Sequence, residues 1–151
     1  MEKELLQIIQ KDFSSYKEKI EVVLDEYEYR LKRYKVNYAL SIYAATGSWD
    51  IENVKNKVRK TDTVIELEEK IFAVVFDFVN DEYGIKACEN LLSKIEPKMF
   101  GKKIYISVLN SKEQKNNDDL IRKVFDLLTF EVKNELCNVP LDAVPLDRDF
   151  F

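Results

Sequence analysis

Four short apolar runs alternate with amphipathic helical segments, and this order constrains the fold of the chain more than any other feature. The runs are rich in β-branched and aromatic residues, which favour strands. They span residues 36–45, 63–67, 71–79 and 103–109. Helices are predicted after the first and third runs, over residues 51–60 and from Asn80 up to Pro97. The charged turn Glu68–Lys70 joins the second and third runs into a hairpin.

The order strand, helix, strand, strand, helix, strand predicts an α+β domain. In this ferredoxin-like βαββαβ arrangement, an antiparallel sheet carries its helices on one face. An extra helix is expected from a cap at Asp118 or Asp119 to about Glu135. The segment beyond it contains Pro140 and Pro145 and is predicted to be irregular. We therefore divide the chain into a leading helix, one domain and a C-terminal tail, over residues 1–35, 36–135 and 136–151.

A long amphipathic helix is predicted ahead of the first strand. Apolar residues recur every three or four positions from Leu5 to Tyr34, which is about eight helical turns without an internal Gly or Pro. Ser14 and Ser15 are expected to soften or interrupt the helix near Phe13. The helix either lies on its own domain or forms a coiled-coil arm that pairs with a second copy, because the apolar spacing averages close to 3.5 residues.

Composition removes several classes of function. The 151 residues include no histidine, which excludes His-based acid–base catalysis and metal sites that use imidazole. Cys88 and Cys137 lie far apart without a CxxC spacing, so neither a zinc site nor a disulfide scaffold is expected. The net charge of −4 does not favour nucleic acid as a partner. Without a long apolar run or a signal-peptide pattern, we expect a soluble cytoplasmic protein that does not bind membranes.

The segment around the hairpin carries a recognisable motif. Arg59-Lys60-Thr61-Asp62 is followed by the five residues TVIEL and then by the charged turn Glu68-Glu69-Lys70. This pattern resembles the GGDEF domain of diguanylate cyclases, in which an RxxD motif stands five residues ahead of the GGDEF hairpin turn. The flanking strands and helices are similar to that family over roughly residues 13–135. The resemblance implies the nucleotidyl-cyclase fold, which agrees with the predicted strand order.

The residues that carry catalysis in the GGDEF family are replaced here, which implies a degenerate member. In that family, acidic residues at the end of the first strand and in the hairpin turn hold two divalent metals that organise the triphosphate. Here the first strand ends in Ala44-Ala45-Thr46, which cannot ligate a hard cation. Glu68 and Glu69 replace the two glycines of the turn, and Ile71 stands in place of the metal-side acid. We therefore expect no catalytic residue, no metal, no cofactor and no enzymatic activity.

The RxxD motif itself is retained. In many GGDEF domains its Arg and Asp form an inhibitory site for cyclic di-GMP, and the resemblance implies this role for Arg59 and Asp62. A guanidinium suits the role because its planar fork binds phosphate oxygens in pairs and stacks on bases. Lys55, one helical turn before Arg59, would add positive charge. The alternative is a surface ion pair between Arg59 and Asp62, worth about 0–1 kcal/mol, or an Asp62 that merely ends the helix.

These observations favour a non-catalytic signalling or scaffolding protein that acts through protein–protein contacts, with a protein partner or as a homodimer through the leading helix. The alternative is a cyclic di-GMP receptor that binds through Arg59, Asp62 and Lys55.

Overall fold

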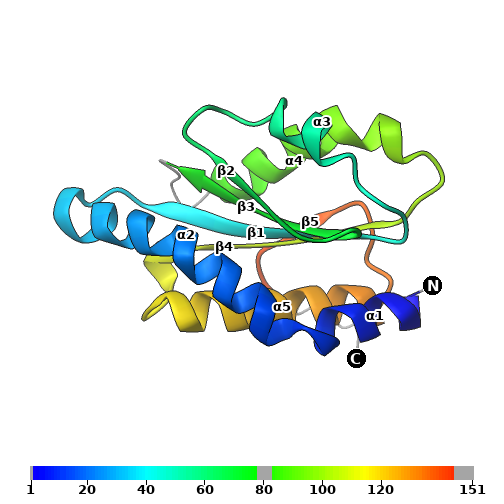
Figure 1. The fold of residues 1–151 in the computed structure, drawn as a ribbon, viewed down its shortest axis with the longest axis horizontal. Coiled ribbons are helices and arrows are strands. Elements are labelled where there is room, and N and C mark those ends of the chain that lie inside the picture. The colour runs from blue at the N-terminus through cyan, green and yellow to red at the C-terminus, as the bar shows by residue number, and fades with distance from the viewer. Residues whose placement is uncertain (1, 78–82, 145–151) are drawn as a thin grey trace.

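One five-stranded sheet forms the centre of the protein, in the order β2-β3-β1-β4-β5 (Figure 1). The computed structural model describes residues 2–77 and 83–144. The strands are β1 (Tyr38–Ala45), β2 (Thr63–Glu68), β3 (Ile71–Asp77), β4 (Ile104–Asn110) and β5 (Pro140–Leu141). β1 pairs antiparallel with β3 and β4, and β2 pairs antiparallel with β3. This order confirms the predicted α+β, βαββαβ arrangement.

The helices cover both faces of the sheet (Figure 1). They are α1 (Glu2–Lys11), α2 (Phe13–Tyr34), α3 (Ile51–Lys55), α4 (Tyr83–Ile95) and α5 (Asn117–Lys133), with short 3-10 helices over Glu96–Met99 and Ser111–Glu113. The two helices inside the βαββαβ unit, α3 and α4, lie on one face. The leading helices and α5 lie on the other, so they add a second helical layer to the one expected for this unit. Both faces are needed because β1, β3 and β4 are buried at every position.

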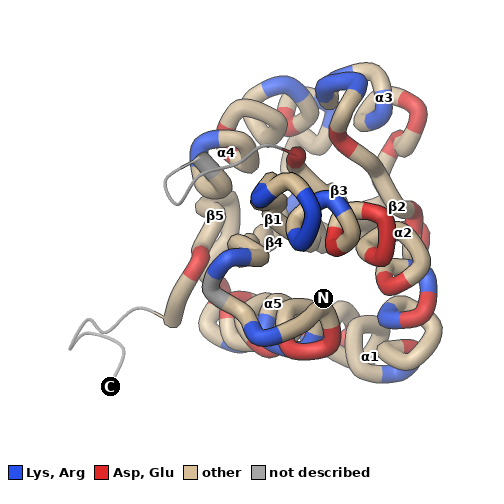
Figure 2. The backbone as a smooth tube through the Cα atoms, turned by 90° about the vertical axis from the view of Figure 1, so that its left-hand side faces the viewer, with Lys and Arg blue, Asp and Glu red and all other residues tan. Residues whose placement is uncertain are grey.

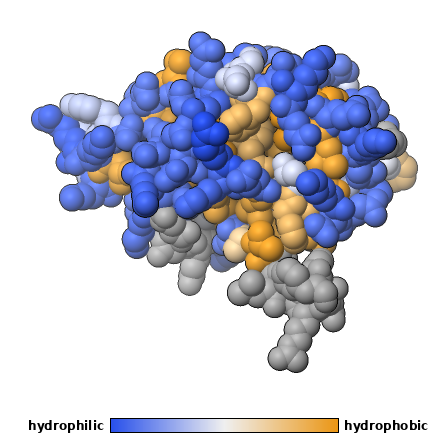
Figure 3. Space-filling view, turned by 90° about the horizontal axis from the view of Figure 1, so that it is seen from below, coloured by the Kyte–Doolittle hydropathy of each residue, from blue (hydrophilic) through white to orange (hydrophobic). Residues whose placement is uncertain are grey.

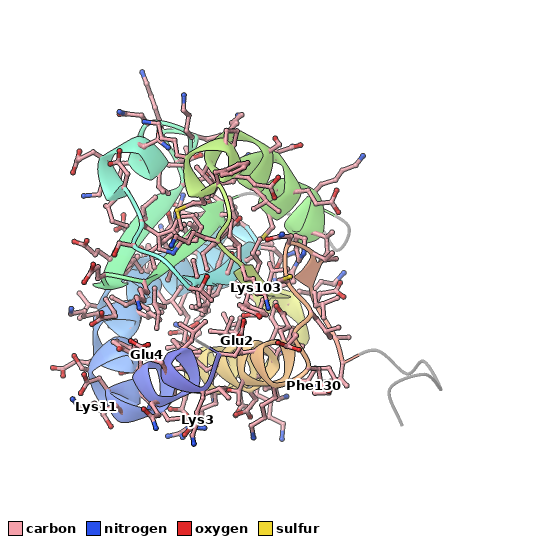
Figure 4. The ribbon with its side chains drawn as sticks, turned by 90° about the vertical axis from the view of Figure 1, so that its right-hand side faces the viewer. Glu2, Lys3, Glu4, Lys11, Lys103 and Phe130 are labelled. Atoms are coloured by element: carbon pink, nitrogen blue, oxygen red, sulfur yellow. The ribbon has the colours of Figure 1, made fainter. Side chains whose placement is uncertain are left out.

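The leading helix lies on its own domain. It is interrupted at Asp12, whose backbone is not helical, close to the break that Ser14 and Ser15 were expected to cause near Phe13. The Tyr16 hydroxyl donates to the carbonyl oxygen of Ile8 (3.2 Å) across the break. The start of α1 is tied to the start of β4. Glu2 and Lys103, the residue before β4, point toward one another (Figure 4), with their charged groups 3.2 Å apart. The Tyr105 hydroxyl of β4 also donates to the Glu2 carboxylate (3.2 Å). The predicted apolar stripe is buried in the core through Leu5, Ile9, Tyr16, Ile20 and Tyr27. Leu24, rather than the predicted Val23, is fully buried, and Tyr34 at the end of the stripe is exposed.

Local capping accounts for most shifts in element boundaries. The Asp50 side chain accepts from the main-chain N–H of Asn53 (3.2 Å) and begins α3, which is only five residues long and ends before the predicted boundary. The helix α5 begins after Asn116, whose side chain accepts from the N–H of Asp119 (2.9 Å), so Asn116 is the cap rather than an aspartate. Part of the tail that was predicted to be irregular, β5, pairs parallel to β4.

Several predicted features lie outside the described residues: the last two positions of the third strand, the helix start at residues 80–82, and Pro145. Within the described ranges, no helix is long and apolar enough to cross a membrane.

Candidate functional site

The loop after β1 is hydrogen-bonded to the β2–β3 hairpin turn, at the end of the sheet where β1 finishes and β3 begins. The main-chain N–H of Ala45 donates to the carbonyl oxygen of Lys70 (3.0 Å). The main-chain N–H of Trp49 donates to the carbonyl oxygen of Glu69 (3.1 Å), and its indole N–H donates to that of Lys70 (3.0 Å). The hydroxyl of Ser48 donates to the Glu69 carboxylate. The loop is therefore fixed to the turn at both its start and its end.

Aromatic rings fill the space next to this loop. Trp49 is 8% exposed and packs edge-on against Phe72, with ring centroids 4.9 Å apart, and against Tyr43 at 6.4 Å. Ile71, in the place that the resemblance gives to a metal-side acid, is fully buried in the core toward α2 and α5. Among residues 2–77 and 83–144, no group of three or more His, Cys, Asp or Glu side chains is arranged to hold a metal ion.

Arg59 and Asp62 bind one another in the turn between α3 and β2. One carboxylate oxygen of Asp62, Oδ2, accepts from the main-chain N–H of Arg59 (3.2 Å) and from its Nε (3.0 Å). The other oxygen, Oδ1, accepts from Arg59 Nη2 (2.9 Å) and from the main-chain N–H of Asp77 (3.0 Å). The Asp62 side chain is 2% exposed and that of Arg59 is 47% exposed. The pair is thus a bidentate, half-buried clamp that joins the turn to the end of β3.

The same pair lines a cavity of about 160 Å³ between this turn and α4. Lys57 and Lys94 also line it, together with Phe76 and Asn90. Basic residues stand on both sides of the region, on α4 and around α3 (Figure 2). The cavity therefore combines three cations with apolar wall atoms, which suits a phosphate or the edge of a base.

Lys55 stands apart from this cavity. Its ammonium group is 3.8 Å from the Glu52 carboxylate, and the residue does not line the cavity. Because α3 ends at Lys55, the expected helical relation between Lys55 and Arg59 is lost, and Lys57 takes the position beside the clamp. Of the three predicted site residues, the structure brings together Arg59 and Asp62.

Two charged residues beside the clamp were missed by sequence reasoning. The Arg30 guanidinium, from α2, donates through Nη1 to Oδ2 of Asp77 (2.9 Å), and the Asp77 side chain is 1% exposed. A signal for this pair exists, because Asp77 is the only charged residue in the run IFAVVFDFV. A lone acid in a buried strand needs a partner, but the sequence does not identify which basic residue supplies it.

Comparison with solved structures identifies the fold. The GGDEF domain of TpbB (or YfiN) from Pseudomonas aeruginosa superimposes with a TM-score of 0.69 at 11% identity, covering 83% of this chain and 87% of that one. The GGDEF domain of DgcB from Caulobacter crescentus in complex with c-di-GMP gives 0.66 at 8% identity, covering 82% and 87%. Diguanylate cyclase SiaD in complex with its activator SiaC, from Pseudomonas aeruginosa, gives 0.61 at 10% identity, covering 80% and 55%.

Neither a protein-family model nor a curated protein matches the sequence. At such low identities the likeness concerns the fold, and the chain has the GGDEF-like fold that its sequence resembles.

Proposed function

We propose that this chain is a non-catalytic signalling or scaffolding protein with a degenerate GGDEF-like fold, which acts through protein–protein contacts. The non-catalytic part of this proposal rests on the contacts at the end of β1, where the following loop meets the hairpin turn. There the loop is bonded to the turn, Trp49 packs on Phe72, and Ile71 is buried where the family has an acid. Ile71 offers a cation no carboxylate oxygen, which a hard cation on a triphosphate requires. Turnover of GTP by the purified chain with magnesium or manganese would overturn this part.

Three features of the helical layer toward α1, α2 and α5 support protein contacts. An apolar strip crosses this face between hydrophilic areas (Figure 3). A cavity of about 380 Å³ opens between the α1–α2 junction and α5, lined by residues that include Ile9, Phe13 and Phe125. On α2, Val22 and Tyr29 are 71% and 58% exposed and lie seven residues apart. This spacing gives a partner helix a short apolar seam without using the stripe that is buried in the core.

The protein is expected to form a homodimer through α2, with a mass by light scattering of twice the 17.8 kDa of the chain. Val22→Asp/Tyr29→Asp should halve this mass, because charges in an apolar seam oppose association. The matched control is Phe100→Asp/Val139→Asp, which changes two exposed apolar residues outside α2, 95% and 54% exposed, and should leave the mass unchanged. A monomer at high protein concentration, or equal effects of the two double variants, would contradict a dimer through this helix.

A second candidate function, a cyclic di-GMP receptor, is favoured by the cavity that Arg59 and Asp62 line with Lys57 and Lys94. At about 160 Å³ it is smaller than the roughly 300–1,000 Å³ of pockets that enclose a drug-sized ligand. It would therefore take one phosphate or one base edge, with the rest of the dinucleotide on the surface. The presence of c-di-GMP in the DgcB structure adds support by likeness of fold.

Calorimetry with cyclic di-GMP should give saturable binding, and Lys94→Glu should weaken it roughly tenfold, because a carboxylate replaces a cation near the phosphates. Lys94 serves better than Arg59 because Arg59 also holds Asp62. The control is Lys123→Glu, on α5 at the other face of the sheet, with unchanged affinity expected. No heat at micromolar ligand, or equal weakening by both variants, would remove this candidate.

A further inference from the structure

Asp77, the last residue of β3, connects both partners of the RxxD clamp to the leading helix. Its main-chain N–H donates to Oδ1 of Asp62 (3.0 Å), and its carbonyl oxygen accepts from Arg59 Nη2 (2.5 Å). Its carboxylate accepts from Arg30 Nη1 (2.9 Å) on α2. One residue therefore bonds the cavity wall through its main chain and α2 through its side chain.

A second contact from α2 holds the same turn. The Tyr27 hydroxyl, one helical turn before Arg30, lies 2.9 Å from the carbonyl oxygen of Thr61 and 2.8 Å from the hydroxyl of Thr63. The Arg30 guanidinium stacks over the Tyr27 ring, 4.5 Å from its centroid, so the two side chains brace one another. Thr61 is inside the RxxD motif, and Asp77 lies beside it. The helix α2 thus holds the motif from two directions.

The charge balance makes Arg30 essential to this arrangement. The carboxylates of Asp62 and Asp77 are both nearly fully buried, with side chains 2% and 1% exposed. Each is matched by one guanidinium: Arg59 for Asp62 and Arg30 for Asp77. Without Arg30, the buried Asp77 carboxylate would lose the one ion pair that it makes among the described residues. Arg59, already bonded to the carbonyl oxygen of Asp77, would then be drawn away from Asp62.

We propose that Arg30 is a positioning residue for the cavity lined by Arg59 and Asp62. By neutralising Asp77 it leaves Arg59 paired with Asp62, so the geometry that recognises a phosphate-bearing ligand depends on where α2 lies. Only the identity of the ligand in this inference rests on the proposed binding of cyclic di-GMP. The dependence of the clamp on α2 exists without ligand and can be measured separately.

The test is amide hydrogen exchange by NMR on the free protein, at the main-chain N–H groups of Arg59 and Asp77, which both donate to Asp62. Arg30→Gln is expected to speed exchange at both groups at least tenfold, while central β1 amides keep their protection. Arg30→Lys should restore most of the protection because it keeps the charge. The control is Arg33→Gln, three residues along α2, whose side chain contacts the exposed Tyr29 hydroxyl at 3.4 Å and the Tyr34 ring at 5.7 Å from its centroid, and which makes no hydrogen bond or ion pair with Arg59, Asp62 or Asp77 among the described residues. It should change neither rate.

Asp77→Asn keeps the experiment decisive if Arg30→Gln does not fold. The amide side chain leaves no buried negative charge to draw Arg59 away from Asp62, so the Arg59 amide should keep its wild-type protection although the ion pair with α2 is lost. Unchanged exchange at Arg59 in Arg30→Gln, or faster exchange there in Asp77→Asn, would overturn the inference. Calorimetry then separates the two proposals: if the wild-type protein binds no cyclic di-GMP, the receptor function fails and the exchange rates alone decide the role of Arg30. If it binds, Arg30→Gln should weaken affinity at least tenfold and Arg33→Gln should not.

Discussion

Replacing Asp62 with alanine is expected to lower the free energy of unfolding by about 3 kcal/mol, because hydrogen bonds to a buried charged group are worth about 1.5–3 kcal/mol each. The Asp62 carboxylate accepts from three nitrogen atoms of Arg59 and from the main-chain N–H of Asp77 while its side chain is 2% exposed. Its removal leaves the Asp77 N–H unpaired and frees the turn before β2. Urea unfolding followed by circular dichroism gives the measurement.

Asp118→Ala is the matched control. Asp118 also pairs with an arginine, Arg122, through its Nε at 2.9 Å, but its side chain is 43% exposed. Solvent screens such a pair, so its loss should cost much less than the loss of Asp62. If the two variants lose equal stability, the Arg59–Asp62 clamp is a surface ion pair after all, as one interpretation of the sequence holds.

Glu131→Gln is expected to make the protein more stable at neutral pH and to flatten its pH dependence. Glu131 lies on α5, fully buried, and one oxygen, Oε2, accepts from the main-chain N–H of Ile106 on β4 (3.0 Å). The other oxygen has no hydrogen-bond partner among the described residues. Burial raises the pKa of the carboxyl from 4.5 to about 9, against the lowering effect of the Ile106 hydrogen bond.

The sign of the pH effect follows from this pKa. Between about pH 4.5 and pH 9 the folded protein keeps a proton on Glu131 that the unfolded chain has lost. The stability that this carboxyl contributes is therefore complete below pH 4.5 and declines as the pH rises through the window. From about pH 5 to pH 7 wild-type stability should fall by about 2 kcal/mol relative to Glu131→Gln.

Urea unfolding at a series of pH values measures this difference. Glu135→Gln, with a side chain that is 62% exposed, is the control and should keep the wild-type slope. Parallel stability curves for the wild-type protein and Glu131→Gln would show that Glu131 is ionised in the folded state.

The strands were predictable because their signal is local. Runs such as residues 38–45 and 71–77 have no room for a helical polar face, and the turn Glu68–Lys70 follows directly from composition. The second helical layer was not predicted from the strand order alone. A second layer follows only from the apolar stripes of the leading helix and α5, because these stripes need a sheet face on which to be buried.

The charged contacts of the site were not predictable, because they depend on distant partners. Asp77 and Arg30 are 47 positions apart, and Glu131 meets Ile106 across 25 positions. The motif identified Arg59 and Asp62 correctly as neighbours, since three positions across a turn fix their distance. The prediction that Lys55 lies beside Arg59 was wrong because it assumed a helix that continues to residue 60, whereas α3 ends at Lys55.

Trp49 is the sole tryptophan of the chain, and it lies where the loop after β1 is bonded to the hairpin turn. Selectively excited tryptophan fluorescence therefore reports on this one end of the sheet, where the Trp49 ring packs against Tyr43 and Phe72. The tryptophan emission and the far-ultraviolet circular dichroism of the helices can be recorded in the same urea titration. The protein thus carries a native optical probe that distinguishes separation of this loop from the hairpin turn from loss of the whole fold.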